Sequence, residues 1–255
     1  MDSAFAHALL RRANDGEIGP TARIAQPAEP AIAFGRLDVR ATGFPLAVAR
    51  SRALGFGPVI RASGGRAAAY TRQTVLLDHV APDDRPGEAM RRRFVEFSSM
   101  LAGVLTGLGV DARVGQVPGE FCPGEFSVNA RGVAKVVGTA QRVVRSAWLF
   151  SAVIVVDGAD ELQALLSGVY ASLGLAFESR SVGSLAQESH LAGTPRVTVQ
   201  QVREALAAGY GALANAEPAE LDQQTLARAH QLLDEHRVDP AVSTTGVDRP
   251  VDSRS

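Results

Sequence analysis

The chain has 255 residues, 46% of them hydrophobic, and its 26 basic and 27 acidic side chains give a net charge of -1. This near-neutral balance argues against a protein built to bind nucleic acid, which needs clustered positive charge, and no apolar run reaches the roughly 18 to 20 residues of a membrane-spanning helix. The single cysteine, Cys122, excludes an internal disulfide, so we expect a cytoplasmic protein without a membrane or nucleic-acid partner.

The first half of the chain is predicted to mix helices with short strands. Apolar side chains at helical spacing predict a helix over residues 3–13, and strand-like runs follow at 22–25 and 31–34. A second helix is expected over 43–54, because Gly55 ends its pattern. Three more strand-like runs and a long amphipathic helix follow, at 58–62, 67–70, 74–80 and 88–108.

In the second half the pattern changes first to strands and then to helices. Strands are predicted at 126–130, 133–144 and 148–156, and helices at 160–173, 198–213 and 221–236. Because strands and helices do not alternate one for one, this order favours an α+β fold with a largely antiparallel or mixed sheet and packed helices. We expect one domain over 1–238 and a disordered tail over 239–255, which contains almost no apolar side chains.

Lysine is nearly absent, since the basic residues are 25 arginines and one lysine, Lys135. Because arginine occupies every other basic position, the retained ammonium indicates a tight polar site that a guanidinium would not fit. On a strand, Lys135 and Thr139 share one face, and the small residues Gly138, Thr139 and Ala140 leave room for a ligand beside the ammonium. The competing interpretation is an exposed strand charge in a sequence with a bias toward arginine codons.

A glycine-containing loop separates two of the predicted strands. In Ser63-Gly64-Gly65 the consecutive glycines permit positive φ, so that main-chain N–H groups can converge on an anion or a carbonyl oxygen. Arg61 and Arg66 flank this loop with planar donors suited to phosphate or carboxylate. A hairpin turn with solvated arginines is the alternative.

Cys122 lies in a second loop, residues 119–125, which contains two glycines and a proline. A cysteine there is either a nucleophile or a small buried hydrophobic residue, and its reactivity depends on a lowered thiol pKa. The five histidines form no pair at metal-ligand spacing, so no metal held by protein ligands is expected.

The two segments around Gly64 and Lys135 together resemble the lipoate–protein ligase and octanoyltransferase family of the biotin/lipoate ligase superfamily. Residues 61–65, Arg-Ala-Ser-Gly-Gly, are similar to the family's R-x-S-G-G-G loop, and residues 135–140, Lys-Val-Val-Gly-Thr-Ala, are similar to its K-[IV]-x-G-[ST]-A strand. The resemblance implies a biotin/lipoate ligase-like catalytic domain, in agreement with the α+β expectation.

The same resemblance implies a function and a set of site residues. The chain would be a lipoate–protein ligase-like enzyme that uses ATP and Mg²⁺ to form an acyl-adenylate from lipoate, and attaches the lipoyl or octanoyl group to a lysine of a lipoyl-carrier domain. Lys135 would contact the carbonyl and the phosphate of that adenylate. The remaining binding residues would be Arg61, Ser63, Gly64, Gly65, Gly138, Thr139 and Ala140.

Two alternatives stay open. Arg66 replaces the third glycine of the family's loop, and Cys122 lies thirteen residues ahead of Lys135, which is similar to the place of the nucleophile in some cysteine-dependent members. The second hypothesis is therefore a nucleotide-independent transferase that takes an octanoyl or lipoyl group, for example from octanoyl-acyl carrier protein, through a Cys122 thioester and needs no cofactor. The third is a non-catalytic acyl-binding protein with the same fold.

Overall fold

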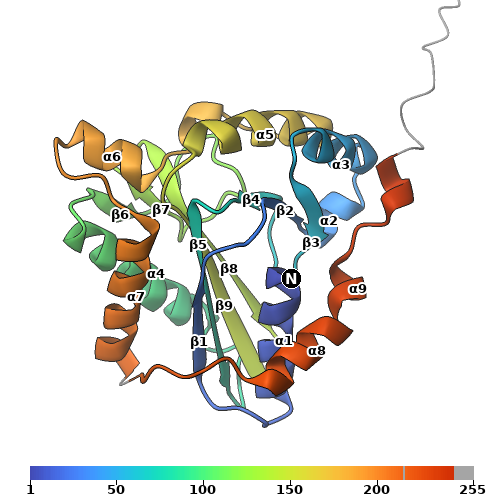
Figure 1. Ribbon diagram of the computed structural model, residues 1–255, viewed down its shortest axis with the longest axis vertical. Coiled ribbons are helices and arrows are strands. Elements are labelled where there is room, and N and C mark those ends of the chain that lie inside the picture. The colour runs from blue at the N-terminus through green and yellow to red at the C-terminus, as the bar shows by residue number, and fades with distance from the viewer. Residues whose placement is uncertain (215, 244–255) are drawn as a thin grey trace, which may run out of the picture.

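Two β-sheets form the centre of the structure, a computed structural model that describes residues 1–214 and 216–243 (Figure 1). All pairings in the larger sheet are antiparallel, and its strands in spatial order are β1 (Thr21–Ala25), β5 (Thr74–Pro82), β9 (Ala147–Val155), β8 (Ala134–Val143), β7 (Val128–Ala130) and β6 (Ala112–Val114). In the smaller sheet β2 (Ala31–Phe34) is parallel to β3 (Gly57–Ile60) and antiparallel to β4 (Ala68–Tyr70). The predicted α+β class with a largely antiparallel sheet is confirmed.

Helices surround the two sheets. They are α1 (Asp2–Asn14), α2 (Arg36–Val39), α3 (Phe44–Ala53), α4 (Met90–Gly107), α5 (Ala159–Ser172), α6 (Leu185–Leu191), α7 (Val199–Ala214), α8 (Gln223–Gln231) and α9 (Leu233–His236). The helix predicted over 221–236 is divided into α8 and α9 at Leu232. The sequence did not indicate α2 or α6, because both are short and each buries a carboxylate, Asp38 and Glu188, where an apolar residue would have marked the inner face.

The predicted tail is ordered at its beginning. Pro240–Ser243 form a 3₁₀ helix, and Val242 packs against the core beside α3 and α5. The expectation of disorder from residue 239 onward is therefore wrong for these residues. The rest of the predicted tail, 244–255, lies outside the described residues.

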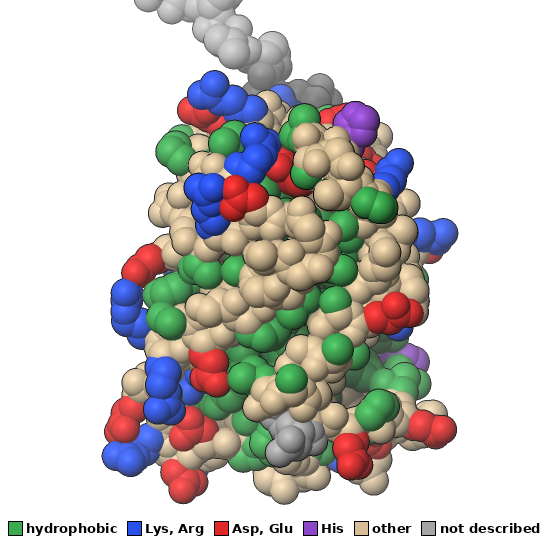
Figure 2. All heavy atoms as spheres, turned by 90° about the vertical axis from the view of Figure 1, so that its left-hand side faces the viewer, with side chains coloured by type: hydrophobic (Ala, Val, Ile, Leu, Met, Phe, Trp, Pro, Cys, Tyr) green, Lys and Arg blue, Asp and Glu red, His purple; other side chains and the backbone are tan. Residues whose placement is uncertain are grey.

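The larger sheet is covered differently on its two faces. On one face α4 and α7 enclose a core that includes Phe97, Phe150 and Leu206, and the outer side of this layer shows apolar side chains between the helices with charged ones mostly toward the edges (Figures 1 and 2). On the other face Leu9 of α1 and Leu149 of β9 belong to a second buried cluster, and the smaller sheet, backed by α3 and α5, lies beside α1. Within the described ranges no helix is long and apolar enough to cross a membrane.

The register of the central strands aligns two rows of side chains under the smaller sheet. Gly138 of β8 pairs with Val153 of β9, and Val153 pairs with Leu76 of β5. Two residues further along, the corresponding row is Ala140, Ser151 and Asp78. Because residues two apart in a strand point to the same face, these two rows form one side of a space between the sheets.

Candidate active site

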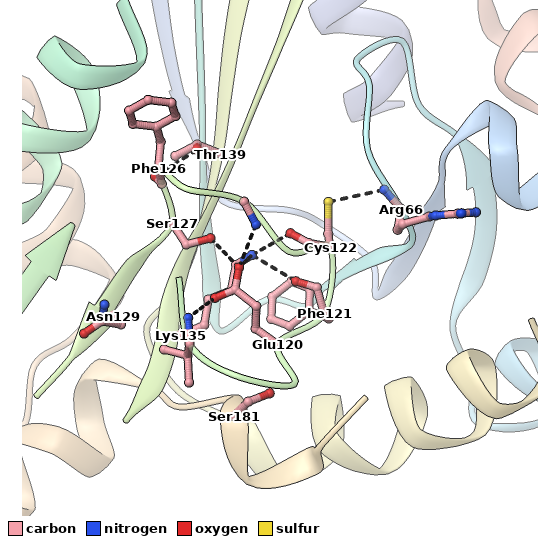
Figure 3. Close-up of polar contacts among 12 residues, drawn as sticks. Arg66, Glu120, Phe121, Cys122, Phe126, Ser127, Asn129, Lys135, Thr139 and Ser181 are labelled. Atoms are coloured by element: carbon pink, nitrogen blue, oxygen red, sulfur yellow. Dashed lines mark hydrogen bonds and ion pairs between the residues drawn. The ribbon is translucent and has the colours of Figure 1, made fainter. Parts of the chain in front are cut away.

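Lys135 holds the loop that carries the cysteine (Figure 3). Its side chain is 1% exposed, and its ammonium donates hydrogen bonds to Glu120 Oε1 at 3.0 Å and to the carbonyl oxygens of Phe121 and Cys122 at 2.9 Å each. Nζ also lies 4.6 Å from the centre of the Phe121 ring, a cation–π contact. Since an ammonium has three N–H groups, all of them are used on this loop.

The Glu120 carboxylate secures the same loop from within. It is buried and accepts hydrogen bonds from the main-chain N–H groups of Val117 at 2.8 Å and Gly124 at 3.0 Å, and from the Ser127 hydroxyl at 2.6 Å. Burial lowers the pKa of Lys135 below its ordinary value, although the Glu120 charge acts in the opposite direction. The two side chains thus form a buried ion pair whose other hydrogen bonds go to the Ser127 hydroxyl and to the backbone around Cys122.

Cys122 has a backbone conformation that few non-glycine residues adopt. Its φ is 42°, in the left-handed region. Its N–H donates to the Tyr170 hydroxyl of α5 at 2.6 Å, and that hydroxyl donates to the Ala67 carbonyl at 2.9 Å. A strained residue that several partners hold in place is typical of functional sites.

The sulfur of Cys122 faces the glycine-containing loop. Arg61 Nη2 lies 3.2 Å from Sγ, and the main-chain N–H of Arg66 donates to Sγ at 3.3 Å. Burial acts against the thiolate, but the charges of Arg61 and Lys135 and these two hydrogen bonds outweigh it, so that the pKa of the Cys122 thiol is lowered. The site therefore favours the nucleophilic form of this cysteine.

The close approach of the loop to the sulfur requires glycine at position 65. Gly65 has a φ of 99°, and a Cβ there would lie 2.7 Å from Cys122 Sγ. The loop is anchored by Asp38 of α2, which accepts a hydrogen bond from the Gly35 N–H at 2.9 Å and pairs with the Arg66 guanidinium at 3.2 Å. The unpredicted helix α2 thus helps to aim the Arg66 N–H at the sulfur.

A pocket that is partly open to solvent includes Cys122 in its wall. Five of the residues predicted to bind substrate line it: Arg61, Ser63, Gly138, Thr139 and Ala140. Gly64 and Gly65 are in the adjoining loop but are not part of the wall, and neither is Lys135, whose Cε lies 3.4 Å from the position of a Cβ on Gly138.

Sequence reasoning missed Glu120 and Tyr170. Glu120 stands only two residues before Cys122, but a sequence does not tell which of several carboxylates in a loop will be buried. Tyr170 belongs to the apolar face of a predicted helix, and only the fold brings its hydroxyl to the cysteine loop. Among the residues that the structure describes, no group of His, Cys, Asp and Glu could hold a metal ion.

The family model that matches this chain and two similar solved structures all describe lipoate-protein ligases. The model of the family described as "Lipoyl protein ligase A/B catalytic domain" matches residues 2–211. The fold is similar to that of lipoate-protein ligase A bound with ATP, with a TM-score of 0.71, 18% identity, and 91% of this chain and 88% of that chain covered. It is also similar to the bipartite lipoate protein ligase of Thermoplasma acidophilum, with a TM-score of 0.68, 18% identity, and 98% and 93% covered.

Two curated relatives share the name octanoyl-[GcvH]:protein N-octanoyltransferase. The chain is 24% identical over 146 residues to the one from Geobacillus kaustophilus. These aligned residues make up 57% of this chain and 51% of the relative. It is 25% identical over 155 residues to the one from Anoxybacillus flavithermus, and this alignment includes 61% of this chain and 55% of the relative. The chain thus matches about half the length of these relatives.

Proposed function

Because the chain belongs to the lipoyl protein ligase A/B catalytic domain family, we propose that it is an octanoyl or lipoyl transferase that carries the acyl group as a thioester on Cys122. One observation carries the proposal. The sulfur in the pocket wall lies within hydrogen-bond distance of a guanidinium and a main-chain N–H, and the pKa of its thiol is lowered. The name of the curated relatives, which are octanoyltransferases, supports the same choice.

The reaction would occur in two steps at one sulfur. In the first, the Cys122 thiolate attacks the carbonyl carbon of the acyl group on a donor carrier protein. The new carbon–sulfur bond forms, the bond to the carrier breaks, and the carrier leaves with a proton. In the second, the uncharged amine of a lysine on a lipoyl-carrier domain attacks the thioester. An amide forms, the Cys122 thiolate is released, and the proton from the amine passes to solvent.

Arg61 is suited to stabilise the negative charge that builds on the acyl oxygen in both steps. Its side chain lines the pocket next to Cys122, and its buried Nε has no hydrogen-bond partner among the described residues. A preorganised donor that faces a developing charge in a site poor in water is a strong source of rate enhancement. The Arg66 N–H, which lies at the sulfur, supports the thiolate in the resting enzyme and on its release.

The surroundings of Lys135 favour the thioester route over the adenylate route. The adenylate route needs an ammonium that is free to contact the acyl carbonyl and the phosphate, but each N–H of Lys135 already has an acceptor in the cysteine loop. The residues around Lys135 therefore do not fit the nucleotide site that the sequence resemblance implied, and we derive no step through ATP or Mg²⁺. Lys135 acts instead by fixing the position of Cys122.

The test is intact-mass measurement without nucleotide. The protein is mixed with an octanoylated carrier protein, and we expect a mass gain of one octanoyl group that maps to Cys122. The Cys122→Ser variant should show no such gain, and because Cys122 is the only cysteine of the chain, no other thiol can replace it. Adding an unmodified lipoyl-carrier domain should then move the group to that domain.

Two outcomes would contradict the proposal. A parallel reaction with lipoate, ATP and Mg²⁺ that releases pyrophosphate and modifies the acceptor equally well in Cys122→Ser would establish the adenylate route. If neither donor modifies the protein or an acceptor, while free fatty acids still bind, the chain is the non-catalytic acyl-binding protein.

A further inference from the structure

The pocket that contains Cys122 extends along the larger sheet toward α1. Its wall on β9 includes Val153, Ser151 and Leu149, which share a face because they are two residues apart; at about 3.3 Å per residue this row spans about 13 Å. Val153 pairs with Gly138, which lies beside the Phe121 ring in the cysteine loop. Leu149, at the other end of the row, packs in the cluster that α1 forms with the sheet. One end of the pocket is therefore reactive, and the other meets a helix.

The first turns of α1 close this far end. Asp2, Ser3 and Ala6 are part of the pocket wall. Asp2 forms an ion pair with Arg23 of β1, and Arg23 also donates to Asp78 of β5 at 3.1 Å. The helix start is thus tied to the sheet by a chain of charges.

A third hydrogen bond ties this network to Ser151, the middle residue of the β9 row. The Ser151 hydroxyl donates to the second oxygen of Asp78 at 2.7 Å, and Asp78 is 6% exposed. An acyl chain that reached further would have to displace hydrogen-bonded, buried charges, which costs far more than contact with apolar side chains. These buried charges therefore set a sharp limit on the length of the acyl chain.

Near the cysteine end, beside Val153, the sides of the pocket are apolar. Ala33 and Ala68 of the smaller sheet face Leu76 and Val153 of the larger sheet across it. Small side chains on one side and branched ones on the other leave room for an unbranched hydrocarbon chain. A bulky or branched acyl group would collide with these walls, since protein interiors are close-packed.

We propose that the first turns of α1, through Ala6 and the Asp2–Arg23–Asp78 network, set the length of the unbranched acyl chain that the pocket accepts. This inference rests on the proposed function for the identity of its substrate. It assigns to residues far from Cys122 the choice of acyl group, while the residues around the sulfur perform the transfer.

The test uses unbranched acyl thioesters of a small thiol, from butanoyl to dodecanoyl, and follows acylation of Cys122 by intact mass. In each reaction the Cys122 thiolate attacks the carbonyl carbon, the bond to Cys122 forms, and the donor carbon–sulfur bond breaks with release of the donor thiolate. Ala6→Leu fills the far end. One methylene too many or too few in an apolar pocket changes kcat/KM by about 10- to 200-fold. The rate of octanoyl transfer should therefore fall about tenfold or more, while the rate of butanoyl transfer stays unchanged.

Two further variants make the test specific. Asp2→Ala removes the carboxylate from the end wall and should raise dodecanoyl transfer relative to octanoyl transfer. Ala171→Leu makes the same alanine-to-leucine change at an exposed position of α5, outside the pocket, and should leave the length profile unchanged. If Ala6→Leu does not fold, Asp2→Ala alone decides the question. A length profile that is the same in the wild type and in the folded variants would overturn the inference.

A binding measurement separates this inference from the proposed function. In the Cys122→Ser protein, free fatty acids of the same lengths should raise the melting temperature by mass action up to a certain length and not beyond it, and Ala6→Leu should shorten that limit. If no thioester acylates Cys122 but this limit exists and moves, the proposed function fails and the length stop stands. If Cys122 is acylated at every length alike, the length stop fails and the transferase stands.

Discussion

Two basic side chains lie close to Cys122, and the structure uses them in different ways. Lys135 is 1% exposed and has every N–H on Glu120 or on a loop carbonyl. Arg61 lines the pocket and bonds the sulfur through Nη2, while its Nε has no partner among the described residues. In the proposed transferase the lysine therefore supports the nucleophile, and the arginine takes part in the chemistry. Acceptors that converge from several directions suit a compact ammonium better than a planar guanidinium.

The largest expected effect on stability and on acyl transfer comes from replacing Lys135. Lys135→Met leaves the Glu120 carboxylate buried without its counter-charge, which should cost about 3–5 kcal/mol of the free energy of unfolding. Acyl transfer should be lost with it, because the carbonyls of Phe121 and Cys122 lose their common donor. Denaturant unfolding measures the first effect, and octanoyl transfer the second.

A double variant separates charge from shape. In Lys135→Met/Glu120→Gln no charge is left unpaired, so most of the lost stability should return, while transfer stays low because the loop is no longer held by the ammonium. Arg91→Gln is the matched control, since Arg91 pairs with Glu125 of the same loop at the surface, where ion pairs contribute little. Equal stability of Lys135→Met and the wild type would show that the buried pair does not support the loop.

The next largest effect comes from the arginine side. Arg61→Met should slow octanoyl transfer by about 100-fold, the usual loss when one oxyanion donor is removed, and should leave stability nearly unchanged because Arg61 is only partly buried. Arg61→Lys keeps the positive charge near the sulfur, so its rate of octanoyl transfer should lie between those of Arg61→Met and the wild type. If Arg61→Met instead lost stability and retained its rate per folded molecule, the roles assigned to the two basic residues would be reversed.

A smaller effect is expected at Tyr170, which holds the cysteine loop from α5. Tyr170→Phe removes the acceptor for the Cys122 N–H and the donor to the Ala67 carbonyl. Leaving such buried groups unpaired costs about 1–3 kcal/mol, so the melting temperature should fall and the transfer rate should decrease less than in Arg61→Met. A transfer rate lower than that of Arg61→Met would mean that the hydroxyl takes part in the reaction itself.

Much of the fold could be predicted from the sequence, because it depends on long periodic segments. The helices at α1, α3, α4, α5 and α7 and the central strands β5, β8 and β9 follow from apolar spacing. The division into two sheets could not be predicted, because it depends on pairings such as β2 with β3 and β4, which join short runs of similar composition. Helix α2 was hidden for a different reason, since its one buried side chain is the carboxylate of Asp38.

The candidate site shows the same limit at the level of single residues. The rarity of lysine and cysteine drew attention to Lys135 and Cys122, and the structure brings the two together. Residue type alone does not tell whether an ammonium points into a pocket or holds a loop, because this depends on where Glu120 and the carbonyls lie. The sequence pattern could thus select Lys135 and Cys122 as candidates, and the different roles proposed for them depend on the geometry.

In the proposed enzyme Arg61, Lys135 and the Arg66 N–H stabilise the Cys122 thiolate, and the pH dependence of Cys122 alkylation by iodoacetamide measures that stabilisation. Because Cys122 is the only thiol, the reading is unambiguous. The unfolded chain should titrate near the ordinary cysteine pKa of about 8.5. The folded wild type should titrate at lower pH, since its thiol pKa is lowered.

The same shift has a consequence for stability whose sign is fixed. A group with a lowered pKa in the folded state adds stability above the pKa of the unfolded thiol, and that contribution is lost as the pH falls through the lower, folded pKa.

In the alkylation measurement we predict that the folded wild type reacts with a midpoint pH below that of the unfolded chain, and that Arg61→Met moves the midpoint back toward that of the unfolded chain. Identical midpoints for the folded wild type and the unfolded chain would show that these groups do not stabilise the thiolate.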